Sequence, residues 1–179
     1  QEGLTVFEIS DFYNYCKANR VDVIPYDGCP HPGATIRYEG DYAIFLDFTK
    51  IQSTRTLRSV CCHELGHAAT GALHKVDSPY ELVERNEYRA KRWVAEHYLT
   101  VEDFRCAFSD GCTQLWQLAE YFDMPEEDVR WALDFWKNTK NKMLYSIFSW
   151  IDAIVFALVA VYFINLYLYF FFIYFYFFF

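Results

Sequence analysis

The residues best suited to chemistry are His63, Glu64 and His67, which form a His-Glu-x-x-His pattern. On a helix, residues four apart lie on one face about one turn apart, so both imidazoles can reach the same ion. Zn²⁺ binds imidazole nitrogen at about 2.0–2.1 Å and lowers the pKa of a bound water to about 7. Glu64 would lie beside that water and take its proton. The pattern therefore predicts one catalytic Zn²⁺ and hydrolysis of a peptide bond.

A catalytic zinc also needs a third protein ligand and one open coordination position. Glu84 and Glu87 lie three residues apart in the following helical segment and so share a face. Ala90 and Val94 continue the stripe of Glu87, and both are small enough to let the two helices approach. Spacing alone leaves both carboxylates as candidate ligands.

His74 is a competing ligand, because another class of zinc peptidases carries a third histidine shortly after the same motif. On a continuous helix His74 would lie roughly 10 Å along the axis from His67, too far to share an ion. If Gly71 ends the helix, His74 can still come near the site. We keep it as an alternative ligand and, with better support, as a group on the substrate side of the metal.

The elements that must position these residues follow from hydrophobic periodicity and from turn residues. We expect helices over residues 5–19, 54–73, 80–98, 101–108, 113–122 and 125–138, and strands over 21–24, 34–38 and 42–46. The last two strands read as a hairpin across Glu39-Gly40-Asp41. The order predicts an α+β fold, with a small antiparallel sheet packed on the motif helix and the glutamate helix, then a helical C-terminal part.

Charge and cysteine usage narrow the class of partner and the compartment. The chain of 179 residues has a formal net charge of −8 at pH 7, which disfavours direct nucleic-acid binding, since such binding needs clustered Lys and Arg. A protein or peptide partner is the better expectation. The six cysteines show no CxxC pair, which is typical of reduced thiols in a reducing compartment.

Composition divides the chain into a domain over residues 1–142 and an apolar tail over 143–179. After Asp152 the tail carries no charge over a stretch longer than the roughly 20 residues that span a bilayer. The lysines before it would keep the domain cytoplasmic by the positive-inside rule. A transmembrane helix and a translated AT-rich gene end both explain the tail. We expect the domain to fold without it and to meet a membrane only through it.

From Ala43 to Phe135 the sequence resembles the ImmA/IrrE family of metallopeptidases of phages, mobile elements and bacterial chromosomes. The resemblance lies in Ala43-Ile44-Phe45-Leu46-Asp47, in the run from Thr56 to His67, and in the run from Tyr80 to Leu99. It implies a zincin-like core. The zinc ligands would be His63, His67 and Glu87, so Glu87 is favoured over Glu84, and Glu64 would be the general base.

The chain departs from the family pattern at Arg89, where a second Glu is common, and at Thr100, where Pro is common. Neither position is a ligand, so the departures concern peripheral packing. The resemblance also implies a cytoplasmic, bacterial or phage-encoded enzyme that cleaves a helix-turn-helix transcriptional repressor. An antirepressor of the same fold, with little or no hydrolysis, is the alternative, and the intact Glu64 favours the enzyme.

Two further expectations concern the surroundings of the metal. His74, Tyr80 and Tyr88 are the candidates for stabilising the oxyanion or for supporting the metal ligands. Residues 113–133 have the spacing of a helix-turn-helix, but their excess of acidic side chains would repel phosphate. We expect this segment to serve in helical packing or in docking a repressor, with DNA contact as the weaker alternative.

Overall fold

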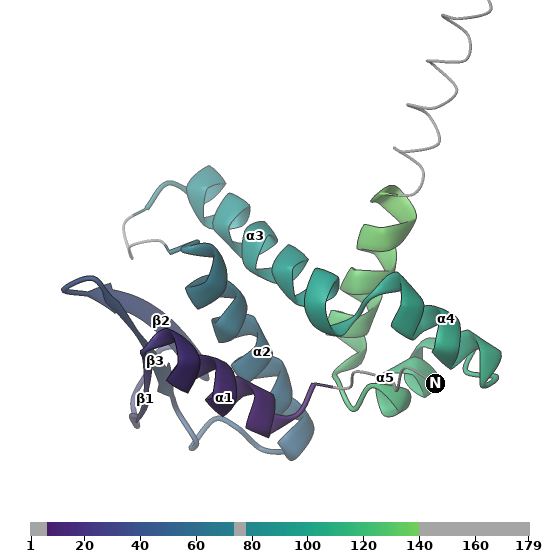
Figure 1. Ribbon diagram of the computed structural model, residues 1–179, viewed down its shortest axis with the longest axis horizontal. Coiled ribbons are helices and arrows are strands. Elements are labelled where there is room, and N and C mark those ends of the chain that lie inside the picture. The colour runs from purple at the N-terminus through teal and green to yellow at the C-terminus, as the bar shows by residue number, and fades with distance from the viewer. Residues whose placement is uncertain (1–6, 74–77, 140–179) are drawn as a thin grey trace, which may run out of the picture. The chain divides into compact units, whose positions relative to one another are not determined.

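A computed structural model describes residues 7–73 and 78–139. Two compact units divide the chain, residues 1–136 and 137–179. The first contains, in order, α1 (Ile9–Asn19), β1 (Val21–Pro25), β2 (Gly33–Tyr38), β3 (Asp41–Leu46), α2 (Thr54–Thr70), α3 (Tyr80–Tyr98), α4 (Val101–Ser109) and α5 (Leu115–Tyr121) (Figure 1). A last helix over residues 126–139 follows. The predicted α+β order is confirmed.

Two expectations fall wholly or partly outside the described residues. His74 and the apolar tail over 143–179 are not among them. Within residues 7–73 and 78–139, no helix combines the length and the apolar character needed to cross a membrane.

Local signals explain where α2 begins and ends. Ser53 is its N-cap, and the Ser53 hydroxyl accepts a hydrogen bond from the backbone N–H of Thr56. Gly71 follows the last helical residue with φ of 61°, a left-handed conformation that glycine adopts without steric cost. The helix therefore stops at Thr70 and not at residue 73 as predicted.

The sheet is mixed, so the prediction of an antiparallel sheet is wrong for one strand pair. The strand order is β1-β3-β2, with β3 antiparallel to β2 and parallel to β1. The two-residue turn Glu39-Gly40 has positive φ at both positions, which closes a tight hairpin between β2 and β3. Because the loop after β1 carries the chain to the far edge before β2 begins, β3 returns between them and runs in the direction of β1.

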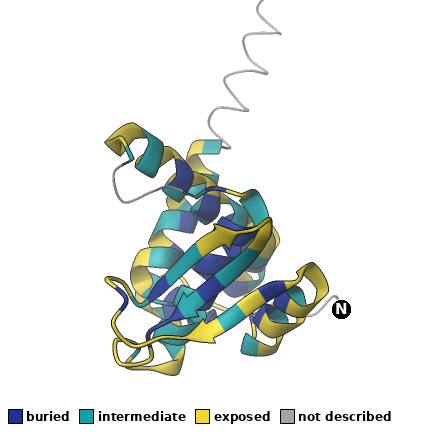
Figure 2. Ribbon diagram, turned by 90° about the vertical axis from the view of Figure 1, so that its left-hand side faces the viewer, coloured by how far each residue is buried: buried dark blue, intermediate teal, exposed yellow. Residues whose placement is uncertain are grey.

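One face of the sheet meets the helices and builds the core. Ile44 and Leu46 of β3 are fully buried, as are Phe12 of α1 and Leu65 of α2, and these residues belong to one hydrophobic cluster. The alternate positions on the strands point away, and Ile36 lies exposed there. Figure 2 shows this alternation as bands of buried and exposed backbone along the strands. The motif helix α2 is thus anchored against the sheet by its apolar face.

The buried thiols belong to the same core. All six cysteines are unpaired, as expected for reduced thiols. Burial raises the pKa of Cys16 to about 11 and that of Cys61 to about 12. Both thiols are therefore protonated at neutral pH. Because metal binding and nucleophilic attack both need the thiolate, these side chains serve as packing groups.

A buried carboxylate organises the loops that flank the sheet. Asp47 directly follows β3 and is fully buried. It accepts hydrogen bonds from the Thr49 hydroxyl and from the backbone N–H groups of Gly28 and Thr49, and it pairs with Lys50 at 3.3 Å. The bond from the Thr49 side chain is the main reason that the pKa of Asp47 falls to about 2, against the opposing effect of burial. The ionised carboxylate thus ties the loop after β1 to the end of β3.

This network predicts a defined pH dependence of stability. The pKa of Asp47 in the folded chain lies below its ordinary value of 3.8, so the ionised form stabilises the fold above about pH 4. That contribution is lost as the pH falls from about 4 to about 2. Asp47→Asn should lower the urea midpoint of unfolding at pH 7, because the amide N–H₂ of the new side chain would face backbone N–H donors. The difference in midpoint between variant and wild type should shrink at pH 3. The exposed Asp22, changed to Asn, is the control. A difference equal at both pH values would contradict this account.

Candidate metal centre

The site depends on a close crossing of α2 and α3. Gly66 of α2 lies directly against the backbone of Ala90 in α3, and a Cβ added at Gly66 would lie 2.6 Å from the Ala90 carbonyl oxygen. No real Cβ comes so close, so only glycine permits this distance between the helices. Both residues are buried. α2 and α3 lie side by side (Figure 1), so side chains of one helix can reach those of the other.

Three side chains converge beside this crossing. The Nε2 atoms of His63 and His67 are 3.1 Å apart. One carboxylate oxygen of Glu87 lies 3.2 Å from Nε2 of His63, and the other lies 3.3 Å from Nε2 of His67. Among the described residues these three form the group that could hold a metal ion, since their ligand atoms all lie within 4.8 Å of one another.

A backbone carbonyl sets the orientation of His67. Its Nδ1 donates a hydrogen bond to the carbonyl oxygen of Ala72 at 2.6 Å. In the neutral ring this bond leaves the lone pair of Nε2 for a metal ion, which is the arrangement in which a ligating histidine is held by its second nitrogen. Gly71 turns the chain so that Ala72 can supply this carbonyl. The helix end thus contributes directly to the site.

The electrostatics of the group favour the ionised, ligating form of Glu87 and, without a metal ion, the protonated form of His67. Hydrogen bonds from His63 and then from His67 hold the pKa of Glu87 far below its usual range, so its carboxylate is ionised at neutral pH. Burial by itself lowers the pKa of His67, but the hydrogen bonds to Glu87 and to the Ala72 carbonyl outweigh it and raise that pKa above its ordinary value. Two imidazoles and an ionised carboxylate are a donor set that Zn²⁺ accepts.

The distances also fit a tetrahedral ion. Ligand atoms at about 2.0–2.2 Å from a tetrahedral zinc lie roughly 3.3–3.6 Å from one another. The three measured separations, 3.1, 3.2 and 3.3 Å, are close to that value. His67 is buried, whereas His63 and Glu87 remain partly open to solvent. The group therefore offers three donors and remains partly accessible to solvent.

The sheet holds Glu64 on another side of α2. Gly33 of β2 lies so close to α2 that an added Cβ would be 2.8 Å from the side chain of Glu64 and 2.7 Å from that of Val60. Two residues along the strand, the Thr35 hydroxyl donates a hydrogen bond of 2.6 Å to the carboxylate of Glu64. Glu64 is buried, with 6% of its surface exposed. The strand thus fixes the one carboxylate that adjoins His63 in the chain.

The structure separates the other candidates from the metal group. Glu84 is exposed and accepts a hydrogen bond from Tyr80, which is itself 71% exposed. Tyr88 packs its ring edge-on against Trp131 and Phe135. His74 lies outside the described residues. The geometry brings Glu87, and not Glu84, to the histidines.

The residues that hold α2 close to α3 and to β2 carry little signal in the sequence. Gly66 follows the pattern residue Leu65 and reads as an unremarkable helix position until its neighbour in α3 is known. Gly33 and Thr35 lie in a strand whose partner helix is not visible from periodicity. The small residue Ala90 was a usable signal, since a small residue opposite glycine marks a close helix crossing.

Comparison of the chain with models of known protein families, with curated proteins and with solved structures finds no match in any of the three. What the site can do therefore follows from its own residues and geometry.

The close contact between α2 and α3 predicts that Gly66→Ala changes stability in the direction opposite to the usual one. Replacing a glycine within a helix by alanine ordinarily stabilises a protein by about 0.5–1 kcal/mol. Gly66→Ala should instead destabilise by about 1–3 kcal/mol, because the new methyl group collides with the Ala90 carbonyl. It should also weaken metal binding, since α3 must move away with Glu87. Urea unfolding and a zinc titration measure the two effects, and a stabilised variant with unchanged affinity would contradict the role of the crossing.

The ligand set is tested by a matched pair of glutamates on α3. Glu87→Gln should lower the affinity for Zn²⁺ by at least about tenfold, because an amide oxygen is a much weaker ligand than an ionised carboxylate. Glu84→Gln is the control, since Glu84 is the same residue type one turn earlier and lies exposed. Equilibrium dialysis with metal analysis gives both values. Loss of metal in Glu84→Gln with retention in Glu87→Gln would reverse the assignment.

Proposed function

We propose that this chain is a zinc-dependent endopeptidase. The observation that carries the proposal is the convergence of His63, His67 and Glu87, with Glu64 held against the sheet next to the first ligand. Three ligands with one accessible position are typical of catalytic zinc, whereas structural zinc has four protein ligands. A carboxylate beside such a site is the remaining part that hydrolysis of a peptide needs.

Each residue has a separate task in this proposal. Zn²⁺ bound there would polarise the substrate carbonyl and make water more acidic. Glu64 accepts the proton of the attacking water and later transfers it to the nitrogen of the departing amine. The hydrogen bond from Thr35 keeps the carboxylate of Glu64 in one orientation while it does so. The Ala72 carbonyl keeps His67 in the tautomer that ligates through Nε2.

The position of β2 supports a protein or peptide substrate. Among the residues that the structure describes, β2 is an edge strand, because it pairs with β3 on one side only. The edge of such a strand offers backbone donors and acceptors to which an extended peptide can add. Gly33 and Thr35 bring this strand directly to Glu64. A peptide bound along β2 would therefore run past the proposed base, and an open edge does not require a free chain end, which favours internal cleavage.

We further propose that the substrate is a helix-turn-helix repressor. This part rests on the resemblance of residues 43–135 to the ImmA/IrrE family and on the acidic charge of the chain, which disfavours DNA as the target. An antirepressor that binds the same repressor without cutting it is the second candidate, and the presence of a positioned Glu64 speaks against it.

A single substitution tests the proposed reaction. Glu64→Gln should retain zinc and the hydrogen bond from Thr35 but lose about 10²–10⁴-fold in cleavage rate, because an amide cannot take up the proton. The assay incubates the full chain with the repressor encoded beside its gene, with and without a chelator, and zinc content is measured on the same preparation. Glu84→Gln should cleave as the wild type does. Tight binding of the repressor without cleavage by the wild type would instead identify an antirepressor.

A further inference from the structure

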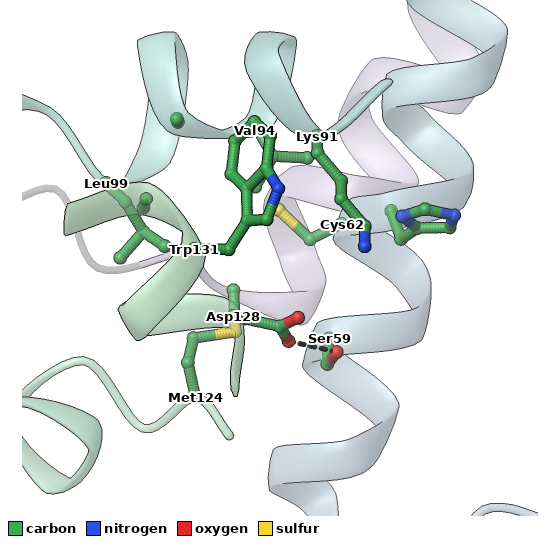
Figure 3. Close-up of a pocket in the computed structure, with 11 residues that line it drawn as sticks. Ser59, Cys62, Lys91, Val94, Leu99, Met124, Asp128 and Trp131 are labelled. Carbon is green, nitrogen blue, oxygen red and sulfur yellow. Dashed lines mark hydrogen bonds between the residues drawn. The ribbon is translucent and has the colours of Figure 1, made fainter. Parts of the chain in front are cut away.

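A small pocket lies between α2, α3 and the helix over residues 126–139, on a different side of α2 from Glu64. The metal-group residue His63 forms part of its wall, next to Cys62 of the same helix. Apolar side chains close the rest, among them Val94, Leu99, Met124 and Trp131 (Figure 3). The pocket therefore adjoins the metal group at His63, on a different side of α2 from the β2 contact.

Lys91 supplies a positive charge to this pocket. It follows Glu87 by four residues on α3 and so lies on the same side of that helix, one turn further along. Its side chain reaches from α3 into the pocket toward Cys62 (Figure 3). Within residues 7–73 and 78–139, no hydrogen bond or ion pair joins the Lys91 ammonium to another side chain or to the backbone.

The second charged group of the pocket is already engaged. The carboxylate of Asp128 accepts a hydrogen bond from the Ser59 hydroxyl, and it makes no ion pair with Lys91 in the part of the chain described. A partly buried ammonium beside apolar walls is unfavourable unless a polar group meets it. Lys91 is thus placed to interact with a group that a second molecule brings to the metal site.

The size and charge of the pocket limit what that group can be. Its volume of about 30 Å³ is enough for a water or a single oxygen atom. A carbonyl oxygen is neutral when it binds and becomes negative only as the reaction proceeds, which suits one ammonium near one engaged carboxylate.

We propose that the Lys91 ammonium binds the carbonyl oxygen of the scissile peptide bond and stabilises the negative charge that develops on it. The proposal rests on the proposed peptidase function. Glu64 removes a proton from water, the water oxygen bonds to the carbonyl carbon, and the carbonyl electron pair moves to the oxygen beside Lys91. That pair then re-forms the carbonyl as the C–N bond breaks, and the amine leaves with the proton from Glu64. Lys91 keeps its own protons throughout.

The kinetic test replaces Lys91 in the full chain. Lys91→Met keeps most of the side-chain packing and removes the charge, and kcat should fall by about 10²–10³-fold with little change in KM, as for loss of one oxyanion donor. Lys91→Arg should recover part of the loss. The control is Arg92→Met, which removes a cation from the neighbouring, exposed position on the same helix and should not alter kcat. A rise in KM with unchanged kcat would overturn the proposal, as would loss of zinc from Lys91→Met.

A binding measurement separates this proposal from the peptidase function itself. Methylphosphonate carries a tetrahedral oxyanion, and its affinity for the zinc-loaded chain should fall by about tenfold in Lys91→Met and stay unchanged in Arg92→Met. If the wild type cleaves nothing but phosphonate binding depends on Lys91, the peptidase function fails and the oxyanion site stands. If cleavage depends on Glu64 while Lys91→Met retains both kcat and phosphonate affinity, the peptidase stands and Lys91 has no such role.

Discussion

The site depends on one steric constraint, the contact between Gly66 of α2 and the backbone of Ala90 in α3. Glu87 is one turn before Ala90, so the distance between the two helix backbones decides whether its carboxylate can reach both histidines. A methyl group at residue 66 would widen that distance, and the 3.2 and 3.3 Å separations between carboxylate and imidazole would be lost. Glycine in a helix is ordinarily unfavourable, and here its cost is offset by a geometry that no other residue permits.

A second glycine makes the corresponding contact on the side of the sheet. Gly33 lets β2 approach α2, and Thr35 can then hold the carboxylate of Glu64. The motif helix is therefore held between a strand and a helix, each at a distance that a glycine allows. This arrangement separates the two tasks of the His-Glu pair, because neighbouring residues on a helix point about 100° apart. His63 faces Glu87 of α3, while Glu64 faces β2.

Much of this arrangement could be predicted from the sequence, for reasons that are local. The i, i+4 spacing of His63 and His67 defines a face on any helix, and Glu39-Gly40 specifies a hairpin by its own conformation. The position of β1 beside β3 could not be predicted, because parallel pairing leaves no local signal. The role of Lys91 was also missed, since a lysine on a helix normally lies in solvent, and only packing of the helix over residues 126–139 against α3 encloses it.

The helix over residues 126–139 belongs to the segment with helix-turn-helix spacing, and one of its faces packs into the core. Val129 and Ala132 are buried in the core, Asp128 bonds to Ser59 of α2, and Trp131 stacks on Phe135 beside Tyr88 of α3. A DNA-reading helix must present a free face with basic or neutral polar residues to the groove. Here the exposed positions include Glu126, Glu127 and Asp134 against Arg130 and Lys137, so acidic side chains are in excess and that face disfavours phosphate. The acidic residues lie on the exposed face of this helix, and its other face forms part of the wall of the pocket beside His63. The spacing that suggests a recognition helix is thus explained by packing, since a helix that covers two others needs the same small and apolar positions.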